Sequence, residues 1–467
     1  METLIKMKRA ISSIHKKNFW FHFLLLAVLL LFFVLMFVGY GPGVYNDSDQ
    51  YIKMHIHREP GYPLFLKALR DIFGEQYLVA MGYIQNVFMA VAIYFFTRTI
   101  SRRFELTFLG ECVVAGIQVF PHLMTKYFSA MSIFVTNSVM SEALCLPLFT
   151  IWSMNCLQML WEGKRKNILS AGGLSLLLSL VRSQFMITIL IWMLCMLWIK
   201  LFQGKTHRIC WTMFILVLTG LLFSARTLAV KSYNLHYNGH FINNTYGNVN
   251  LFTNMLYASD RSYGEDIKDE QARTFFYQMY DLAEAAGANY KYAGHSMAER
   301  AQHIEKYHDD IKFLYIEDVF YQYYDHHVTT DYITQNLLAD EVTMKMMKGI
   351  FPKCFGTWLK TYFCIAYFGL IRSVAVVHPL LNVAAMGIYV LALLSGVFLW
   401  KQKKDSPAIP MMLFAFLFIG ANVYAVSITI MCLSRYMIYG FSLFYTSWFL
   451  VLYELIKPRL CAKLFQE

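Results

Sequence analysis

The sequence predicts an all-α polytopic membrane protein, a bundle of about ten transmembrane helices with an external first loop and a larger, mainly helical external region. Of the 467 residues, 57% are hydrophobic and only 15% are charged, and the mean hydropathy is +0.43. Soluble domains carry charge on about a quarter of their residues. A helix needs about 20 apolar residues to cross the bilayer. Apolar runs lie at Phe19–Tyr40, Gln76–Thr97, Phe108–Pro121, Ser141–Trp161, Ile168–Val181, Phe185–Phe202, Ile209–Val230, Ala375–Trp400, Pro407–Met431 and Tyr436–Ile456.

The first run is expected to remain in the protein as a membrane span. Phe19–Tyr40 contains no Lys, Arg, Asp or Glu. A secretory signal peptide has a shorter apolar core, followed by a cleavage site with small residues. Neither feature is present here, so the interpretation as a signal peptide is disfavoured.

The basic residues indicate how the chain is threaded. Short cytoplasmic loops collect Lys and Arg, whereas short external loops do not. After an N-terminal tract at Lys6–Lys17, basic clusters follow every second run, so we expect both termini in the cytoplasm and the protein in the cell membrane. The net charge of +11 thus indicates membrane topology rather than a nucleic-acid partner. These clusters are Arg98 with Arg102 and Arg103, Lys164–Lys166, Lys205 with Arg208, Lys401–Lys404, and Lys457 with Arg459.

This threading divides the chain into three parts. An N-terminal membrane module covers residues 1–230 and includes the first external loop, 41–75. An extracytoplasmic, mainly helical region covers 231–374, and C-terminal spans cover 375–467. In the middle region, "DEQARTFFYQMYDLAEAAG" has the apolar period of a helix, with Gly287 as its expected C-cap.

Phe351–Arg372 is apolar enough to be an eleventh span, but a span there would move the Lys401–Lys404 tract outside. We therefore expect this segment to lie along or partly in the membrane interface. Just before it, Val342, Met346 and Ile350 repeat at helical spacing. An amphipathic helix that packs on the external region would give the same pattern, and both interpretations stay open. A disulfide between Cys354 and Cys364 is also left open.

Ionisable residues at the outer ends of the predicted spans are the candidate functional groups. Charged side chains at membrane depth are unfavourable and usually face a cavity or a partner. Asp47 and Asp49, Glu142, Arg182 and Arg435 all fall on the same predicted side of the membrane. Each has a structural alternative: the arginines could anchor helix ends at the interface, and the carboxylates could cap helices or turns.

A metal site is not supported by the sequence, and no cofactor is expected, although a divalent metal remains possible. The external histidines, among them His55, His57, His303 and His308, have spacings that match no standard zinc pattern. His55 and His57 are more simply interpreted as solvated loop residues. The chain also lacks a GxxxxGK[ST] phosphate loop and a nucleophile elbow.

Several short motifs carry a family resemblance. They are "DSDQY" at 47–51, "REPGYPLFL" at 58–66, "NSVMSEALCLPLF" at 137–149, "GLSLLLSLVRSQF" at 173–185 and "SRYMIYGFSLF" at 434–444. Together they resemble the polyprenol-dependent glycosyltransferases of the GT-C superfamily, in particular bacterial relatives of protein O-mannosyltransferases and aminoarabinose transferases. The resemblance covers most of the spans, but little between 231 and 372.

The resemblance implies a sugar transferase with a polyprenyl-phosphate-sugar donor and an extracytoplasmic glycan, lipid or protein acceptor. By the aspartate motif, Asp47 takes the role of catalytic base, with Asp49 as the second candidate. Many members have an adjacent Asp-Glu pair, whereas Ser48 follows Asp47 here. The other residues expected to bind substrate are Tyr51, Arg58, Tyr62, Glu142, Arg182, Arg435 and Tyr436.

The chemistry of such a donor fits these residue types independently. A sugar on an isoprenoid phosphate stays at the membrane surface, where arginines stabilise the leaving phosphate and a carboxylate takes the acceptor proton. A single displacement would invert the anomeric centre. The alternatives are a carrier or flippase for lipid-linked glycans, for which Arg226 and Glu111 are the main polar residues within spans, and a protein like the O-antigen ligases or polymerases.

Overall fold

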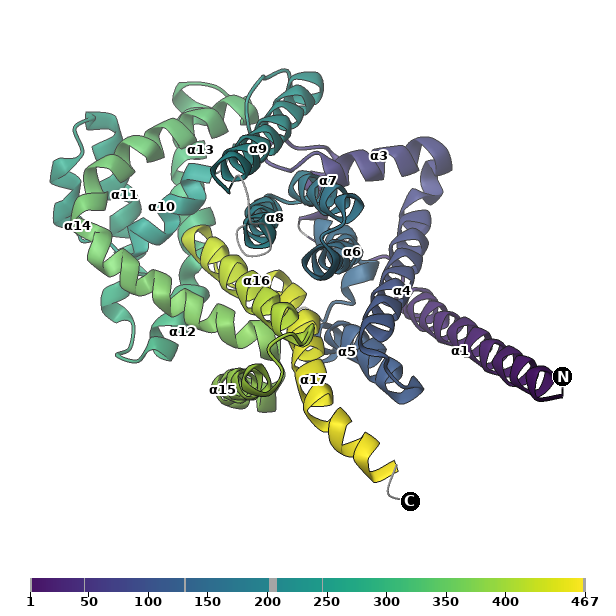
Figure 1. Cartoon of the computed structure of the whole chain (residues 1–467). Coiled ribbons are helices and arrows are strands. Elements are labelled where there is room, and N and C mark those ends of the chain that lie inside the picture. The colour runs from purple at the N-terminus through teal and green to yellow at the C-terminus, as the bar shows by residue number, and fades with distance from the viewer. Residues whose placement is uncertain (1, 46, 130–131, 201–207, 246, 465–467) are drawn as a thin grey trace.

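The computed structural model describes residues 2–45, 47–129, 132–200, 208–245 and 247–464. In these ranges the chain is built from helices, with one isolated bridge between Gly43 and Ser138 (Figure 1). Predicted features at Phe202, Lys205 and 465–467 lie outside the described residues. The α-helices are α1 (Glu2–Tyr40), α2 (Ser48–Ile52), α3 (Gly61–Phe73), α4 (Tyr77–Phe104), α5 (Phe108–Tyr127), α6 (Ser141–Glu162), α7 (Arg165–Val181), α8 (Met186–Trp198), α9 (Arg208–Asn238), α10 (Gly247–Tyr257), α11 (Glu270–Ala285), α12 (Met297–Asp310), α13 (Asp318–His327), α14 (Tyr332–Ala375), α15 (Pro379–Gln402), α16 (Ala408–Thr429) and α17 (Ser434–Leu464).

The prediction of a multi-pass helical membrane protein is confirmed. Within the described residues, 9 helical stretches are long and apolar enough to cross a membrane. All but one match predicted spans; the exception is α14. The predicted spans at Ile168–Val181 and Phe185–Phe202 correspond to α7 and α8. These two helices have 17 and 13 residues and are too short to be counted among the nine.

Close contacts between helices depend on small residues. A Cβ atom built on Gly82 of α4 would lie 1.9 Å from the ring of Phe37 on α1. Only hydrogen fits there, so α1 and α4 can approach closely at this level. Gly369 of α14 is similar, because its Cβ would lie 2.8 Å from Cys432 and from Val423. Small residues at such crossings are typical of helix packing in membranes.

Side-chain contacts reveal the direction of the late helices. The Trp448 indole of α17 donates a hydrogen bond to Ser395 of α15 (3.1 Å), and Lys403 at the end of α15 pairs with Glu454. α15 therefore runs parallel to α17, and both begin at the same end of the bundle. We call this end, which also carries the loop 41–60, the Asp47 end.

Both ends of α14 lie at the Asp47 end of the bundle. At its start, the Tyr332 ring lies 5.9 Å from the His55 ring, in the loop after α2. Past its end, the His378 ring lies 4.6 Å from Phe128, the residue that follows α5. Both ends of this single 44-residue helix thus lie near the same end of the bundle, although its length and composition alone would allow a span.

The region between α9 and the second half of α14 has a hydrophobic core that continues into buried residues of α15, α16 and α17. Phe252, Phe276, Phe320 and Met346 are almost fully buried in it. Val342 and Ile350 are also buried there, so the expected periodic face of this stretch packs on the region's helices. The C-cap of α11 is Ala286, and Gly287, the expected C-cap, is the next residue and has the positive φ of +71° that favours glycine there.

Cys354 and Cys364 do not form the disulfide that the sequence left open. Both are free and buried on the same helix, α14. Ten residues along an α-helix correspond to about 15 Å, well beyond the reach of a disulfide.

Candidate functional site

The loop 41–60 is fixed to the segment before α6. The Gly43 amide donates to the Asn137 carbonyl (2.9 Å), and the Val139 amide donates to the Gly43 carbonyl (2.8 Å). A turn of helix, α2, follows, and its first residue is preceded by Asp47, whose side chain makes no capping hydrogen bond. The Asp47 carboxylate therefore faces partners from other segments.

Asp47 is held by two arginines from distant parts of the chain. Its Oδ1 accepts from Arg58 Nη2 at 2.9 Å, and its Oδ2 lies 3.3 Å from Arg435 Nη2 at the start of α17. Burial opposes ionisation of Asp47, but the guanidinium groups of Arg58 and Arg435 outweigh it and hold the pKa below its usual range. Asp47 is thus ionised at neutral pH, with a side chain that is still 32% exposed.

Glu142, in the first turn of α6, forms the deeper half of the site. Its side chain is only 2% exposed. Oε2 lies 2.9 Å from Arg182 Nη1, and Oε1 lies 3.7 Å from Arg435 Nε. Arg435 thus lies between the two carboxylates, so α6, the α7–α8 connection, α17 and the first loop meet at one place.

Two tyrosines orient these guanidinium groups. The Arg58 guanidinium lies 4.7 Å from the centre of the Tyr51 ring and also donates to its hydroxyl (3.2 Å). Arg182 lies 4.7 Å from the centre of the Tyr436 ring, and Arg435 donates to the Tyr436 hydroxyl (2.9 Å). Cation–π contacts and hydrogen bonds limit the rotamers of the arginines, which prepares them to hold an anion.

We call Asp47, Arg58, Glu142, Arg182 and Arg435 the charged cluster. It contains three permanent cations and two carboxylates, which leaves one excess positive charge. Because Asp47 is the more exposed of the two acids, an incoming anion would meet Asp47 and its arginines first. Such a site can bind one anionic group and still keep a carboxylate beside it.

Two of the residues expected at the site lie apart from the cluster. Asp49 is 59% exposed and pairs with Lys53 at 2.7 Å, on the opposite side of α2 from Asp47. Tyr62 is fully buried, and its hydroxyl donates to Gln85 of α4 (3.0 Å). Its ring contacts Tyr51 edge-on at 5.2 Å, so Tyr62 supports the site from below.

Sequence reasoning missed three polar residues that complete the site. Ser141 accepts from Arg182 (2.9 Å) and shares a hydrogen bond with the Tyr51 hydroxyl (3.0 Å). Gln50 Oε1 accepts from Arg58 Nε (2.7 Å) and contacts His57 Nε2 (2.8 Å). Ser141 lies directly before Glu142, and Gln50 lies directly before Tyr51. The sequence motifs indicated only Glu142 and Tyr51, because charge and aromatic character made these two residues stand out.

Lys312 is the third, and it comes from the region with no recognised motif. It lies in a π-helical segment, Ile311–Glu317, and Arg58 and Asp47 are among the charges that act on it. Burial lowers the pKa of Lys312 and lowers that of His57 to about 3. His57 is thus a neutral, partly buried imidazole bonded to Gln50, and its interpretation as a solvated loop residue was wrong.

Among the described residues, no group of three or more His, Cys, Asp or Glu side chains is arranged to hold a metal ion. Comparisons of the chain with protein-family models, with curated proteins and with solved structures gave no significant match. Arguments about function therefore depend on the geometry of the charged cluster.

Proposed function

We propose that this protein is an integral membrane glycosyltransferase that moves a sugar from a polyprenyl-phosphate donor to an extracytoplasmic acceptor. One observation carries the proposal: Asp47, Arg58, Glu142, Arg182 and Arg435 meet at one end of a membrane-embedded bundle. These are the groups that such a transfer needs, a base and cations for a phosphate.

The proposed topology places this end at the outer surface of the membrane. In it, ten helices cross the bilayer, with α7 and α8 among them, and α14 lies along the outer interface. Both ends of α14 are at the Asp47 end, which supports this arrangement. Stacked side chains at Phe355, Trp358 and Tyr362 of α14 also fit, because Trp and Tyr are enriched where membrane and water meet.

The donor phosphate would take over arginines that now hold Asp47. Arg58 and Arg435 each contact Asp47, and a phosphate offers more charge and more acceptor oxygens than one carboxylate. Glu142 would keep Arg182 and one edge of Arg435 in place from below. Once its partners turn to the phosphate, the pKa of Asp47 would rise and its carboxylate would become a stronger base.

In the transfer step, the acceptor oxygen attacks the anomeric carbon as the bond from that carbon to the phosphate oxygen breaks. The acceptor proton passes to Asp47, and the electron pair of the broken bond leaves with the polyprenyl phosphate. Arginines stabilise the charge that develops on this leaving group. General base catalysis of this kind contributes about 10²- to 10⁴-fold, and a single displacement inverts the anomeric configuration.

The carrier alternative is less well supported. A transport path should contain polar residues that are available at mid-span. Arg226 of α9, however, pairs with Glu59 in the first loop, and Glu111 of α5 bonds to Ser101 and lies 3.5 Å from Arg98. Both residues thus have structural partners within the protein.

The test is consumption of a polyprenyl-phosphate sugar by the purified protein in detergent, where no gradient exists. The Asp47→Asn variant should lose transfer, whereas Asp49→Asn, which removes an exposed acid from the same short helix, should retain it. Full activity in both variants would refute the assignment of the base. Activity insensitive to Asp47 but dependent on residues 231–374 would favour the ligase-like alternative.

A further inference from the structure

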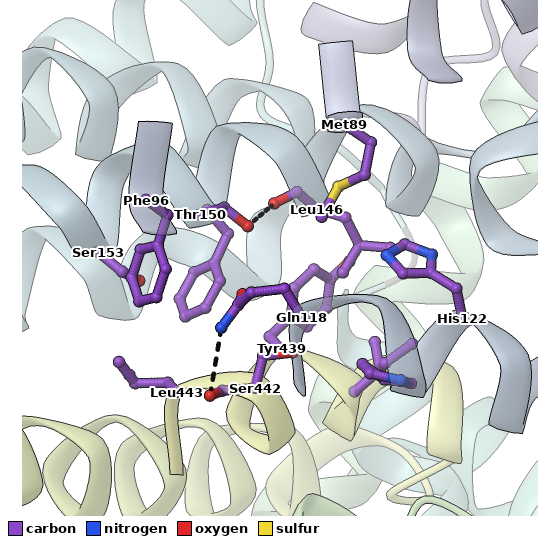
Figure 2. A pocket seen from close by; sticks show the side chains of 13 residues that line it. Met89, Phe96, Gln118, His122, Leu146, Thr150, Ser153, Tyr439, Ser442 and Leu443 are labelled. Atoms are coloured by element: carbon purple, nitrogen blue, oxygen red, sulfur yellow. Dashed lines mark hydrogen bonds between the residues drawn. The ribbon is translucent and has the colours of Figure 1, made fainter. Parts of the chain in front are cut away.

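A small cavity lies inside the bundle, below the charged cluster, between α4, α5, α6 and α17 (Figure 2). Leu146 and Tyr439 line it, one helical turn below Glu142 and Arg435 respectively. Its walls mix apolar side chains with polar ones, which is unusual at the centre of helices this apolar. In Figure 2, His122 and Ser153 lie at opposite ends of the lined space.

Some polar groups of the cavity are satisfied within the protein. Gln118 donates to the Ser442 carbonyl (3.4 Å) and to Thr446 (3.0 Å). Thr150 donates to the Leu146 carbonyl one turn earlier (3.0 Å), the usual arrangement for a hydroxyl in an apolar helix.

Three others are not satisfied. His122 Nδ1, Ser153 Oγ and the Tyr439 hydroxyl have no hydrogen-bond partner, and each residue is at most 2% exposed. Ser153 lies three residues after Thr150 on α6, yet its hydroxyl makes no bond back to its own helix. Burying a polar atom without a partner costs about as much as losing a hydrogen bond, so three such residues along one cavity favour a bound ligand.

We propose that this cavity is a water-binding site. The volume open to the centre of a water-sized sphere is about 20 Å³. One water molecule needs roughly 10–15 Å³ of such volume, so the cavity holds one or two water molecules. Water suits the lining because it donates to the imidazole nitrogen and both donates to and accepts from hydroxyls. A larger ligand would not fit this space, and a charged one would find no Asp, Glu, Lys or Arg among the lining residues.

The bound water would stiffen the support of the charged cluster. Ser153 belongs to α6, which carries Glu142, and Tyr439 belongs to α17, which carries Arg435. Hydrogen bonds through water are nearly as favourable as direct ones. This inference concerns the bundle itself and holds whether or not the protein transfers sugars.

The direction in which the melting temperature changes on substitution tests whether the cavity binds water. If the cavity is dry, Ser153→Ala and Tyr439→Phe each remove an unsatisfied polar atom and should raise the melting temperature of the purified protein. If water is bound, each variant removes one of its partners and should lower the melting temperature. The matched control is Thr150→Val, which removes a hydroxyl from the same cavity whose partner is the protein itself.

We expect both variants to melt at a lower temperature than the wild-type protein. A melting temperature that is unchanged or raised in either variant would overturn the proposal. An independent measurement is a structure of the wild-type protein at a resolution where ordered waters are visible. Density within hydrogen-bond distance of Ser153 Oγ and the Tyr439 hydroxyl is expected, and an empty cavity would contradict the inference.

Discussion

The Asp47→Asn variant should bind the donor more tightly while it loses transfer. In the wild-type protein, Asp47 contacts Arg58 (2.9 Å) and Arg435 (3.3 Å), the groups that would bind the donor phosphate in the proposed function. A hydrogen bond to a charged group contributes about 1.5–3 kcal/mol, against about 0.5–1.5 kcal/mol for a neutral one. The substitution should therefore weaken the competition of residue 47 for these arginines by roughly 1–1.5 kcal/mol, which corresponds to about tenfold tighter binding of the donor.

Transfer should fall by about 10²- to 10⁴-fold in the same variant, because an amide cannot accept the acceptor proton. The assay measures donor affinity with a labelled polyprenyl-phosphate sugar and single-turnover transfer on the same preparation. Asp49→Asn is the matched control and should alter neither quantity, since Asp49 pairs with Lys53 at the surface. Weaker donor binding by Asp47→Asn would mean that Asp47 contacts the donor directly, and the competition argument would be wrong.

Three further outcomes follow from the fold. Glu142→Gln leaves Arg182 buried without its counter-charge and should destabilise the protein by about 3–5 kcal/mol in thermal unfolding, whereas Asp49→Asn should change stability by less than about 1 kcal/mol. His57, with a pKa lowered to about 3, binds fewer protons in the folded state than in the unfolded state. The free energy of unfolding should therefore decline as the pH falls below about 6.5, by about 2 kcal/mol at pH 5. The His57→Gln variant should lack this part of the decline in melting curves recorded at several pH values. Gly82→Val should push Phe37 away and loosen α1 from α4, detected as faster proteolysis of the loop 41–60; unchanged proteolysis would show that the contact can adjust.

The sequence indicated which residues share an end of the bundle, but not which of them touch. Hydropathy and the alternation of basic clusters placed Asp47, Glu142, Arg182 and Arg435 on one side, because each lies at a helix end. Distances among them depend on how α6, α7 and α17 pack, and short motifs contain no information about that packing. Tyr51 and Tyr436 were expected from the resemblance, and the structure adds that their rings lie against guanidinium groups.

The middle region was the least predictable part. Its helices and the buried face of α14 follow from apolar periodicity, which is a local property. Lys312 could not have been found this way, since only the docking of Ile311–Glu317 beside the first loop brings it near Arg58. The course of α14 is similar: its composition permits a span, and only the contacts at Tyr332 and His378 show where its ends lie.

The ambiguity between Asp47 and Asp49 has a simple geometric solution. Successive residues of an α-helix are about 100° apart, so two acids separated by one residue point about 200° apart and cannot both face one site. Positions i and i+4 share a face. Asp47 therefore lies on the side of Tyr51, toward Arg58, and Asp49 lies on the side of Lys53, with which it pairs. With a single helical turn here, a second carboxylate must come from another helix, and Glu142 of α6 is in that position through Arg435.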